Sequence, residues 1–144
     1  MTLEANKQLC RDYFAAFLKG DTGWMREHIA PTFVRHDPSL PFEVRGPEGV
    51  AKLQDVLMTA FPNMKLPFED FVAEGEKVLV RLRVKATHTG AFGDMAATGR
   101  KIDIGVLDLF QIRDGVLIEH WALLDNLGMQ IGRASCRERV LVAV

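Results

Sequence analysis

The spacing of apolar residues changes at Pro62, and this change constrains the fold more than any other feature of the sequence. Before Pro62 the apolar residues recur at the spacing of amphipathic helices. After Pro62 they alternate with polar residues, as in half-buried strands. Helices followed by antiparallel strands predict a fold of the α+β class. A strongly curved sheet of this kind wraps around its helices and leaves a conical pocket.

Three helices are predicted before Pro62, each with start and stop signals. The first has an apolar stripe that includes Tyr13, Phe14 and Phe17. The capping and terminating residues, in chain order, are Thr2 and Lys19-Gly20, then Asp21 or Thr22 and Pro31, then Gly46-Pro47-Glu48 and Pro62. Between the second and third helices we expect a short extended piece at 32–36 and a proline-containing loop at 37–45.

Four strands are predicted after Pro62, at 66–73, 78–89, 101–113 and 116–125. A long glycine-containing connection spans 90–99, and Asp114-Gly115 forms a tight turn. The second strand is the clearest, because Val80 and Leu82 alternate with Arg81 and Arg83. A curved sheet leaves an outer face that needs cover, so we expect a homodimer.

The composition is that of one globular domain in a chain of 144 residues. A formal net charge of −1 gives no basic field for nucleic acid, and no apolar run approaches the roughly 20 residues that span a bilayer. The two cysteines, Cys10 and Cys136, indicate a reducing compartment without a disulfide framework, so a cytoplasmic protein is expected.

The end of the chain differs in character from the rest. Residues 131–140 resemble the in-frame translation of a common sequencing adapter. We therefore expect one domain at 1–130 and a non-native tail at 131–144, to which we assign no function. A natural basic C-terminal segment is the alternative.

Three local patterns in the strand region point to one family. They are the run Arg81 to Gly90, the triplet Thr98-Gly99-Arg100, and the run Ile112 to Val116 leading into Glu119-His120-Trp121 and Asp125. Together with the helical N-terminal half and Gly46 to Gly49, they resemble the SnoaL-like polyketide (ester) cyclases over roughly residues 5–130. That family belongs to the superfamily named after nuclear transport factor two.

The resemblance implies a fold, an activity and a site. The fold is a cone-shaped curved antiparallel sheet wrapped around three N-terminal helices, a cystatin-like α+β barrel. The activity is an intramolecular aldol condensation that closes a ring in an aromatic polyketide methyl ester, without metal or cofactor. The acid/base residue of these cyclases is an aspartate four residues beyond the tryptophan of the last strand, which here is Asp125. The expected ligand is a small hydrophobic molecule with a carbonyl group.

The residues themselves give three catalytic candidates. Asp125 ends an apolar strand, where burial would desolvate it and favour proton abstraction next to a carbonyl; a turn aspartate is the alternative. Asp108 lies inside a very apolar strand, where it either faces the pocket and couples to Asp125 or is bonded to the backbone or to Arg81. His36 is placed at the pocket rim, or is a loop histidine without a role.

Further residues are candidates for substrate binding: Trp121, Phe110, Gln111, Arg81 and His88. Trp121 and Phe110 would otherwise belong to the core, and His88 would otherwise make structural bonds at a turn. His120 alternates oppositely to Asp125 and is therefore expected on the other face from the pocket. His36, His88 and His120 lack the local spacing of metal ligands, so no metal is predicted.

Three function classes are consistent with these residues. The first is a cofactor-free enzyme that transfers protons on a hydrophobic carbonyl compound. The second is a non-catalytic module of the same fold that binds a ligand or a second copy. The third is an epoxide-hydrolase-like enzyme in which Asp108, Arg81 and Asp125 form an Asp-Arg-Asp set.

Overall fold

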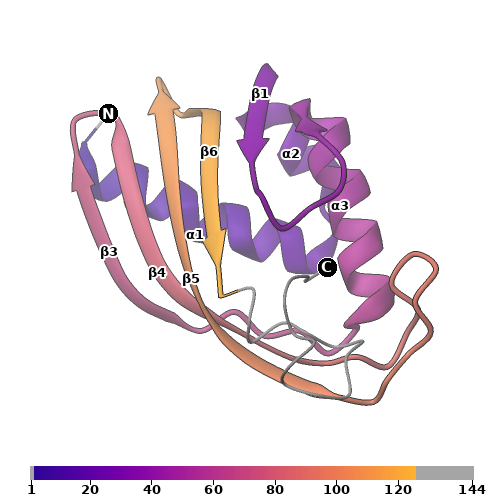
Figure 1. Cartoon of the computed structure of the whole chain (residues 1–144). Helices are drawn as coiled ribbons and strands as arrows, with labels where there is room; N and C mark the ends of the chain where they lie inside the picture. The colour runs from indigo at the N-terminus through magenta and orange to yellow at the C-terminus, as the bar shows by residue number, and fades with distance from the viewer. Residues whose placement is uncertain (1, 126–144) are drawn as a thin grey trace.

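One curved sheet wraps around the helices in the computed structural model, which describes residues 2–125 (Figure 1). The elements within these residues are α1 (Leu3–Lys19), α2 (Thr22–His28), β1 (Ile29–His36), β2 (Val44–Arg45), α3 (Gly46–Ala60), β3 (Phe68–Glu74), β4 (Lys77–Thr87), β5 (Lys101–Arg113) and β6 (Val116–Leu124). No helix in this part of the chain is long and apolar enough to cross a membrane. The α+β prediction is confirmed, and the expected tail at 131–144 lies outside the described residues.

The helices begin and end where local chemistry dictates. The Oγ1 atom of Thr2 accepts a hydrogen bond from the Ala5 N–H at 3.0 Å, and Gly20 ends α1 in the left-handed conformation at φ 69°. Asp21 caps α2 by accepting from the Trp24 N–H at 3.0 Å. The prediction that Pro31 closes α2 was wrong: the helix ends at His28, and Pro31 already lies in β1.

The sheet order is β2-β1-β6-β5-β4-β3. The last four strands form the predicted antiparallel meander. However, β1 is longer than expected and pairs in parallel with β6, so that Val34 lies opposite Glu119. The short strand β2 lies in the predicted loop and pairs with β1, with Val44 opposite Arg35. Two residues are too few to show a period, which is why the sequence did not reveal β2.

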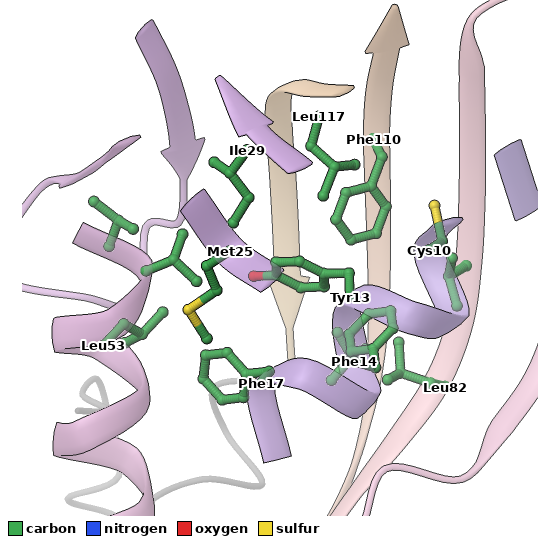
Figure 2. Packing of buried hydrophobic residues seen from close by; sticks show 14 of the residues in the cluster. Cys10, Tyr13, Phe14, Phe17, Met25, Ile29, Leu53, Leu82, Phe110 and Leu117 are labelled. Atoms are coloured by element: carbon green, nitrogen blue, oxygen red, sulfur yellow. The ribbon is translucent and has the colours of Figure 1, made fainter. Parts of the chain in front are cut away.

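The core lies between the concave face of the sheet and the helices, with Tyr13 near its centre (Figure 2). The inward residues of β4, such as Val80 and Leu82, are almost fully buried, as the alternation predicts. Tyr13 packs edge-on against Phe110, with ring centroids 5.3 Å apart. Contacts between aromatic side chains therefore hold α1 against β5.

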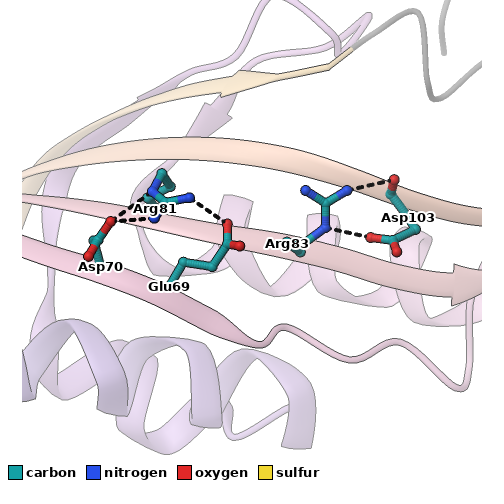
Figure 3. A network of polar contacts seen from close by, with 5 residues as sticks. All are labelled: Glu69, Asp70, Arg81, Arg83 and Asp103. Carbon is teal, nitrogen blue, oxygen red and sulfur yellow. Dashed lines mark hydrogen bonds and ion pairs between the residues drawn. The ribbon is translucent and has the colours of Figure 1, made fainter.

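Charged side chains occupy part of the opposite, outer face of the sheet (Figure 3). Arg81 Nε donates to Asp70 Oδ2 at 2.8 Å, and Arg81 Nη1 donates to Glu69 Oε1 at 3.1 Å. Arg83 Nε donates to Asp103 Oδ1 at 2.6 Å. The alternation in β4 thus separates a buried apolar face from an exposed face of ion pairs, as the sequence indicates.

Candidate active site

A cavity of about 70 Å³ lies between the helices and the concave face of the sheet. Most of its wall is apolar, and the described residues that form it are Tyr13, Phe14, Phe17, Arg35, Leu57, Phe61, Met64, Leu66, Leu82, Val84, Ile102, Val106, Asp108 and Leu124. Only Tyr13, Arg35 and Asp108 bring polar atoms to this part of the wall. Any chemistry in the cavity that uses the described residues therefore depends on these three side chains.

Asp108 projects inward from the middle of β5 and is paired with a histidine of β6. Only 3% of Asp108 and none of His120 is exposed. His120 Nε2 lies 3.0 Å from Asp108 Oδ1, and the His120 ring stacks on Phe110 with centroids 4.1 Å apart. Burial lowers the pKa of His120, although the Asp108 carboxylate acts in the opposite direction. A neutral imidazole therefore lies beside the cavity carboxylate at pH 7.

Arg35 brings a positive charge from β1 to the same cavity. Its Nε and Nη2 both donate to Asp37 Oδ2, at 3.0 and 2.7 Å. The other oxygen of Asp37 accepts from the backbone N–H and the hydroxyl of Ser39, at 3.0 and 2.6 Å. Burial lowers the pKa of Arg35, but the neighbouring Tyr13, Asp108 and Asp37 together raise it above its ordinary value. Arg35 is thus a fixed and permanent cation.

Tyr13 comes from the middle of α1, on the stripe that packs against the sheet. It is 1% exposed, and no described residue accepts the proton of its hydroxyl group. Burial raises the pKa of Tyr13 to about 12, although the Arg35 charge opposes this shift. The hydroxyl is therefore a neutral donor in an apolar setting.

Several predicted site residues lie on the outer face of the sheet instead. His36 Nε2 lies 2.6 Å from Glu119 Oε2, and its ring stacks on Trp121 with centroids 5.4 Å apart. Gln111 Nε2 donates to Glu76 Oε1 at 3.0 Å. Arg81, bound to Asp70 and Glu69, shares this face. These four residues are therefore separated from the cavity by the sheet, and the expected set of Asp108, Arg81 and Asp125 does not form.

Phe110 and His88, two of the predicted substrate-binding residues, are packed in the interior and do not line the cavity. Phe110 is fully buried between Tyr13 and His120, and its ring packs against both of these side chains. His88 is also fully buried, and its Nδ1 accepts from the Thr98 N–H at 3.2 Å, which ties the start of the 88–100 connection to its end. Burial lowers the pKa of His88, so this anchor is a neutral imidazole.

Comparison of the chain with known proteins identifies its family. A family model described as a SnoaL-like polyketide cyclase matches residues 7–131. The chain belongs to this family. It is 31% identical over 103 residues to the aklanonic acid methyl ester cyclase DnrD of Streptomyces peucetius, a match that covers 71% of this chain and 68% of DnrD. A match of 30% identity to the cyclase DauD of Streptomyces sp. (strain C5) covers 72% of this chain and 63% of DauD.

Solved structures of other proteins share the fold. TsrD from Streptomyces laurentii superposes with a TM-score of 0.78 at 27% identity, covering 92% of this chain and 98% of TsrD. Wild-type IdmH from Streptomyces antibioticus superposes with a TM-score of 0.73 at 30% identity, covering 86% of this chain and 94% of IdmH. The cone-shaped fold implied by the resemblance is therefore confirmed.

Within this SnoaL-like fold, Asp125 does not have the environment that the sequence suggested. It is exposed just after β6, and its N–H donates to the Gly105 carbonyl at 3.1 Å. The expectation of a desolvated carboxylate was wrong, because the outward-facing positions of β6 are Glu119, Trp121 and Leu123. The neighbouring Leu124 lines the cavity instead. A catalytic role for Asp125 stays a prediction.

The expectation for His120 was also wrong, since it lies on the cavity side. A register shift between Gln111 and Ile112 moves the pairing by one residue, so that Asp108 lies opposite Ala122. Tyr13, Arg35 and His120 are the polar residues that sequence reasoning missed. The signal for Tyr13 was present: it is the single tyrosine of the chain, and it occupies a core position of an amphipathic helix.

Proposed function

We propose that this chain is a cofactor-free cyclase that closes a ring by aldol-type chemistry on a small hydrophobic carbonyl compound, with Asp108 as the proton acceptor. The observation that carries this proposal is a carboxylate on the wall of a largely apolar cavity, 3% exposed and paired with a neutral histidine. A carboxylate held at a fixed position on the cavity wall can accept a proton from a carbon of a bound carbonyl compound.

The reaction needs no co-reactant. Asp108 takes a proton from the carbon next to one carbonyl group, and the resulting enolate carbon attacks a second carbonyl carbon of the same molecule. A carbon–carbon bond forms, the second carbonyl oxygen receives a proton, and the product is a cyclic β-hydroxy carbonyl compound with the atoms of the substrate. Asp108 ends in its starting state when it returns the proton.

The relatives narrow the substrate class to be tried. DnrD and DauD are named for aklanonic acid methyl ester, so aromatic polyketide methyl esters are the first candidates. The cavity of about 70 Å³ holds on the order of five water molecules, well below the 300–1,000 Å³ of a pocket that encloses a drug-sized ligand. We therefore expect the reacting ring to enter the cavity and the rest of a larger substrate to remain outside.

The substitution Asp108→Asn tests the proposed base, since it keeps the shape of the side chain and removes the proton acceptor. Turnover of an accepted ester or β-hydroxy ketone should fall by about two to four orders of magnitude, mainly in kcat. Asp103→Asn is the matched control: Asp103 is on the same strand but pairs with Arg83 on the outer face, so turnover should be unchanged.

The variant Asp125→Asn separates the two candidate carboxylates. If it loses turnover while Asp108→Asn retains it, the base is Asp125 and the assignment made from the cavity is wrong. If both folded variants turn over an accepted substrate at the parental rate, neither carboxylate is the base. A folded parent that binds such compounds without turning them over would be a non-catalytic binding protein.

A hydrolase is the second candidate, because Arg35 shares the cavity with Asp108 and is bonded to Asp37. Two carboxylates around an arginine suit the activation of a water molecule for epoxide opening. Reaction in ¹⁸O-labelled water distinguishes the two functions. Hydrolysis puts labelled oxygen into the new hydroxyl group, whereas aldol closure retains the hydroxyl oxygen that the substrate carbonyl already carried, apart from label exchanged into free ketones.

A further inference from the structure

Proton abstraction by Asp108 leaves the two donors of the cavity, Tyr13 and Arg35, without a role. Both side chains line the same cavity as Asp108. When a carbon gives up its proton to a carboxylate, the negative charge moves to the substrate oxygen. Donors that are already fixed around that oxygen stabilise its developing charge without having to reorganise.

The Tyr13 hydroxyl has the properties of such a donor. Its ring is held by edge-on contacts with Phe14, Phe110 and His120, at centroid distances of 5.2, 5.3 and 5.8 Å. Among the described residues, nothing accepts its proton. Buried hydroxyl groups are normally paired, because an unpaired one costs free energy, and an exception calls for an explanation. A ligand oxygen supplies one.

Arg35 complements this donor. Its Nε and Nη2 are occupied by Asp37, and Asp37 is in turn held by Ser39. These bonds fix the plane of the guanidinium group, and its charge and hydrogen-bonding capacity also act on the Tyr13 hydroxyl, where they oppose the rise in pKa. The preorganised cation therefore has donor capacity left for a ligand on the cavity side.

We propose that the Tyr13 hydroxyl and Arg35 Nη1 together bind the substrate oxygen that becomes the enolate, and that the cavity selects a single ring carrying an enol, phenol or enolate oxygen. This inference deepens the proposed function and rests on it for the reaction, but its test measures binding. Asp37 acts as a positioning residue, since it reaches the ligand only through Arg35.

The test uses 4-nitrophenol, whose ionised and neutral forms absorb at different wavelengths. Asp108→Asn is the parent for binding, because its uncharged side chain represents the protonated acid that faces an enolate. This parent should bind the nitrophenolate at least about tenfold more tightly than the wild type, since the cavity then lacks the opposing negative charge. The absorbance of the bound probe should report the ionised form.

Adding Tyr13→Phe to this parent should weaken nitrophenolate binding by about tenfold or more, because a charge-assisted hydrogen bond is lost. Binding of nitrobenzene, which has no hydroxyl group, should be unchanged and shows that the cavity is intact. Adding Arg35→Lys, which keeps the charge but not the fixed geometry, should also weaken nitrophenolate binding selectively. Arg81→Lys on the outer face is the matched control and should have no effect.

The proposal fails if Tyr13→Phe binds nitrophenolate as tightly as its parent, or if the parent binds no nitrophenolate. It also fails if Tyr13→Phe is strongly destabilised, because the hydroxyl would then have a structural partner. These results are independent of turnover by Asp108→Asn in the single-variant assay. Failure of the oxygen site can therefore be distinguished from failure of the proposed function.

Discussion

His120 is a neutral imidazole in the interior, and its burial makes the folding stability depend on pH. Burial lowers the pKa values of His120 and His88 below the ordinary value of 6.5. The unfolded chain therefore binds more protons than the folded chain as the pH falls through 6.5, and folding stability declines with it.

The urea midpoint of unfolding should thus fall as the pH is lowered from about 7.5 to 5.5. Between about pH 7.5 and 8.5 it should change little, because both histidines are neutral in the folded and the unfolded chain; this range is the internal control. A midpoint that is constant or rises on acidification to pH 5.5 would contradict the neutral, buried state of these side chains. Measurements below about pH 4.5 would report carboxylates such as Asp103, whose pKa is lowered by Arg83.

Prediction at the scale of single residues succeeded where the strand pattern was regular. Asp108 was expected either to face the pocket and couple to Asp125 or to be bonded to the backbone or to Arg81; it lines the cavity, but its partner is His120. Asp125 and His120 were placed on the wrong faces because strand periodicity is strict, so that a one-residue register shift reverses every side chain beyond it. Arg35 was missed because its environment depends on the long-range pairing of β1 with β6.

At the scale of elements, the connection between β4 and β5 is attached to the end of α3. The N–H groups of Thr89 and Gly90 both donate to the Ala60 carbonyl at 3.1 Å. A Cβ atom on Gly90 would lie only 1.9 Å from the Thr59 carbonyl oxygen. Beyond this point Phe92 packs on Phe61, which lines the cavity, with ring centroids 6.1 Å apart. The glycine thus permits a close contact that supports one wall of the site.

The substitution Gly90→Ala should destabilise the protein by about 1–3 kcal/mol, because the clash involves backbone that cannot move aside easily. Gly105→Ala is the control, since a Cβ atom there would meet its nearest neighbour, Arg83 Nη1, at 3.8 Å. Chemical denaturation of both variants measures the difference. Equal stability of the two would mean that the connection separates from α3 at little cost.

Most elements could be predicted from the sequence, and the exceptions have a common physical cause. The cap Thr2 and the bounds of β5 were predicted correctly, and Asp21 was one of the two residues expected to cap α2, because each depends on residues close in the chain. The strand β2 and the first part of β1 were not predicted. Their conformation depends on partners distant in sequence, as in the pairing of Ile29 with Leu117.

At the scale of the whole molecule, the outer face of the sheet carries apolar side chains in adjoining rows. Strand pairing places Val72 beside Leu79 and Leu107 beside Leu123. Their exposed fractions are 60%, 36%, 42% and 61%, respectively. Contiguous exposed apolar side chains are a common feature of interfaces, so the homodimer expected from the sequence stays a prediction with this face as its interface.

Light scattering at micromolar concentration should give twice the monomer mass, as a standard interface of roughly 1,600 Å² would hold there. Leu123→Asp should shift the mass to that of one chain, because it introduces a charge into the centre of the face. Leu3→Asp, at an exposed position of α1 on the helix side of the sheet and not on its outer face, should leave the dimer intact. A monomeric parent would rule out this assembly.

The parallel pairing of β1 with β6 also determines when the protein can complete its fold during synthesis. A ribosome releases β1 early and β6 late, so β1 has no β6 to pair with while the intervening residues emerge. Until then the apolar stripes of the helices, including Tyr13 and Phe17, have no complete sheet to cover them. A nascent chain of this kind should therefore remain a substrate for chaperones until β6 has left the exit tunnel.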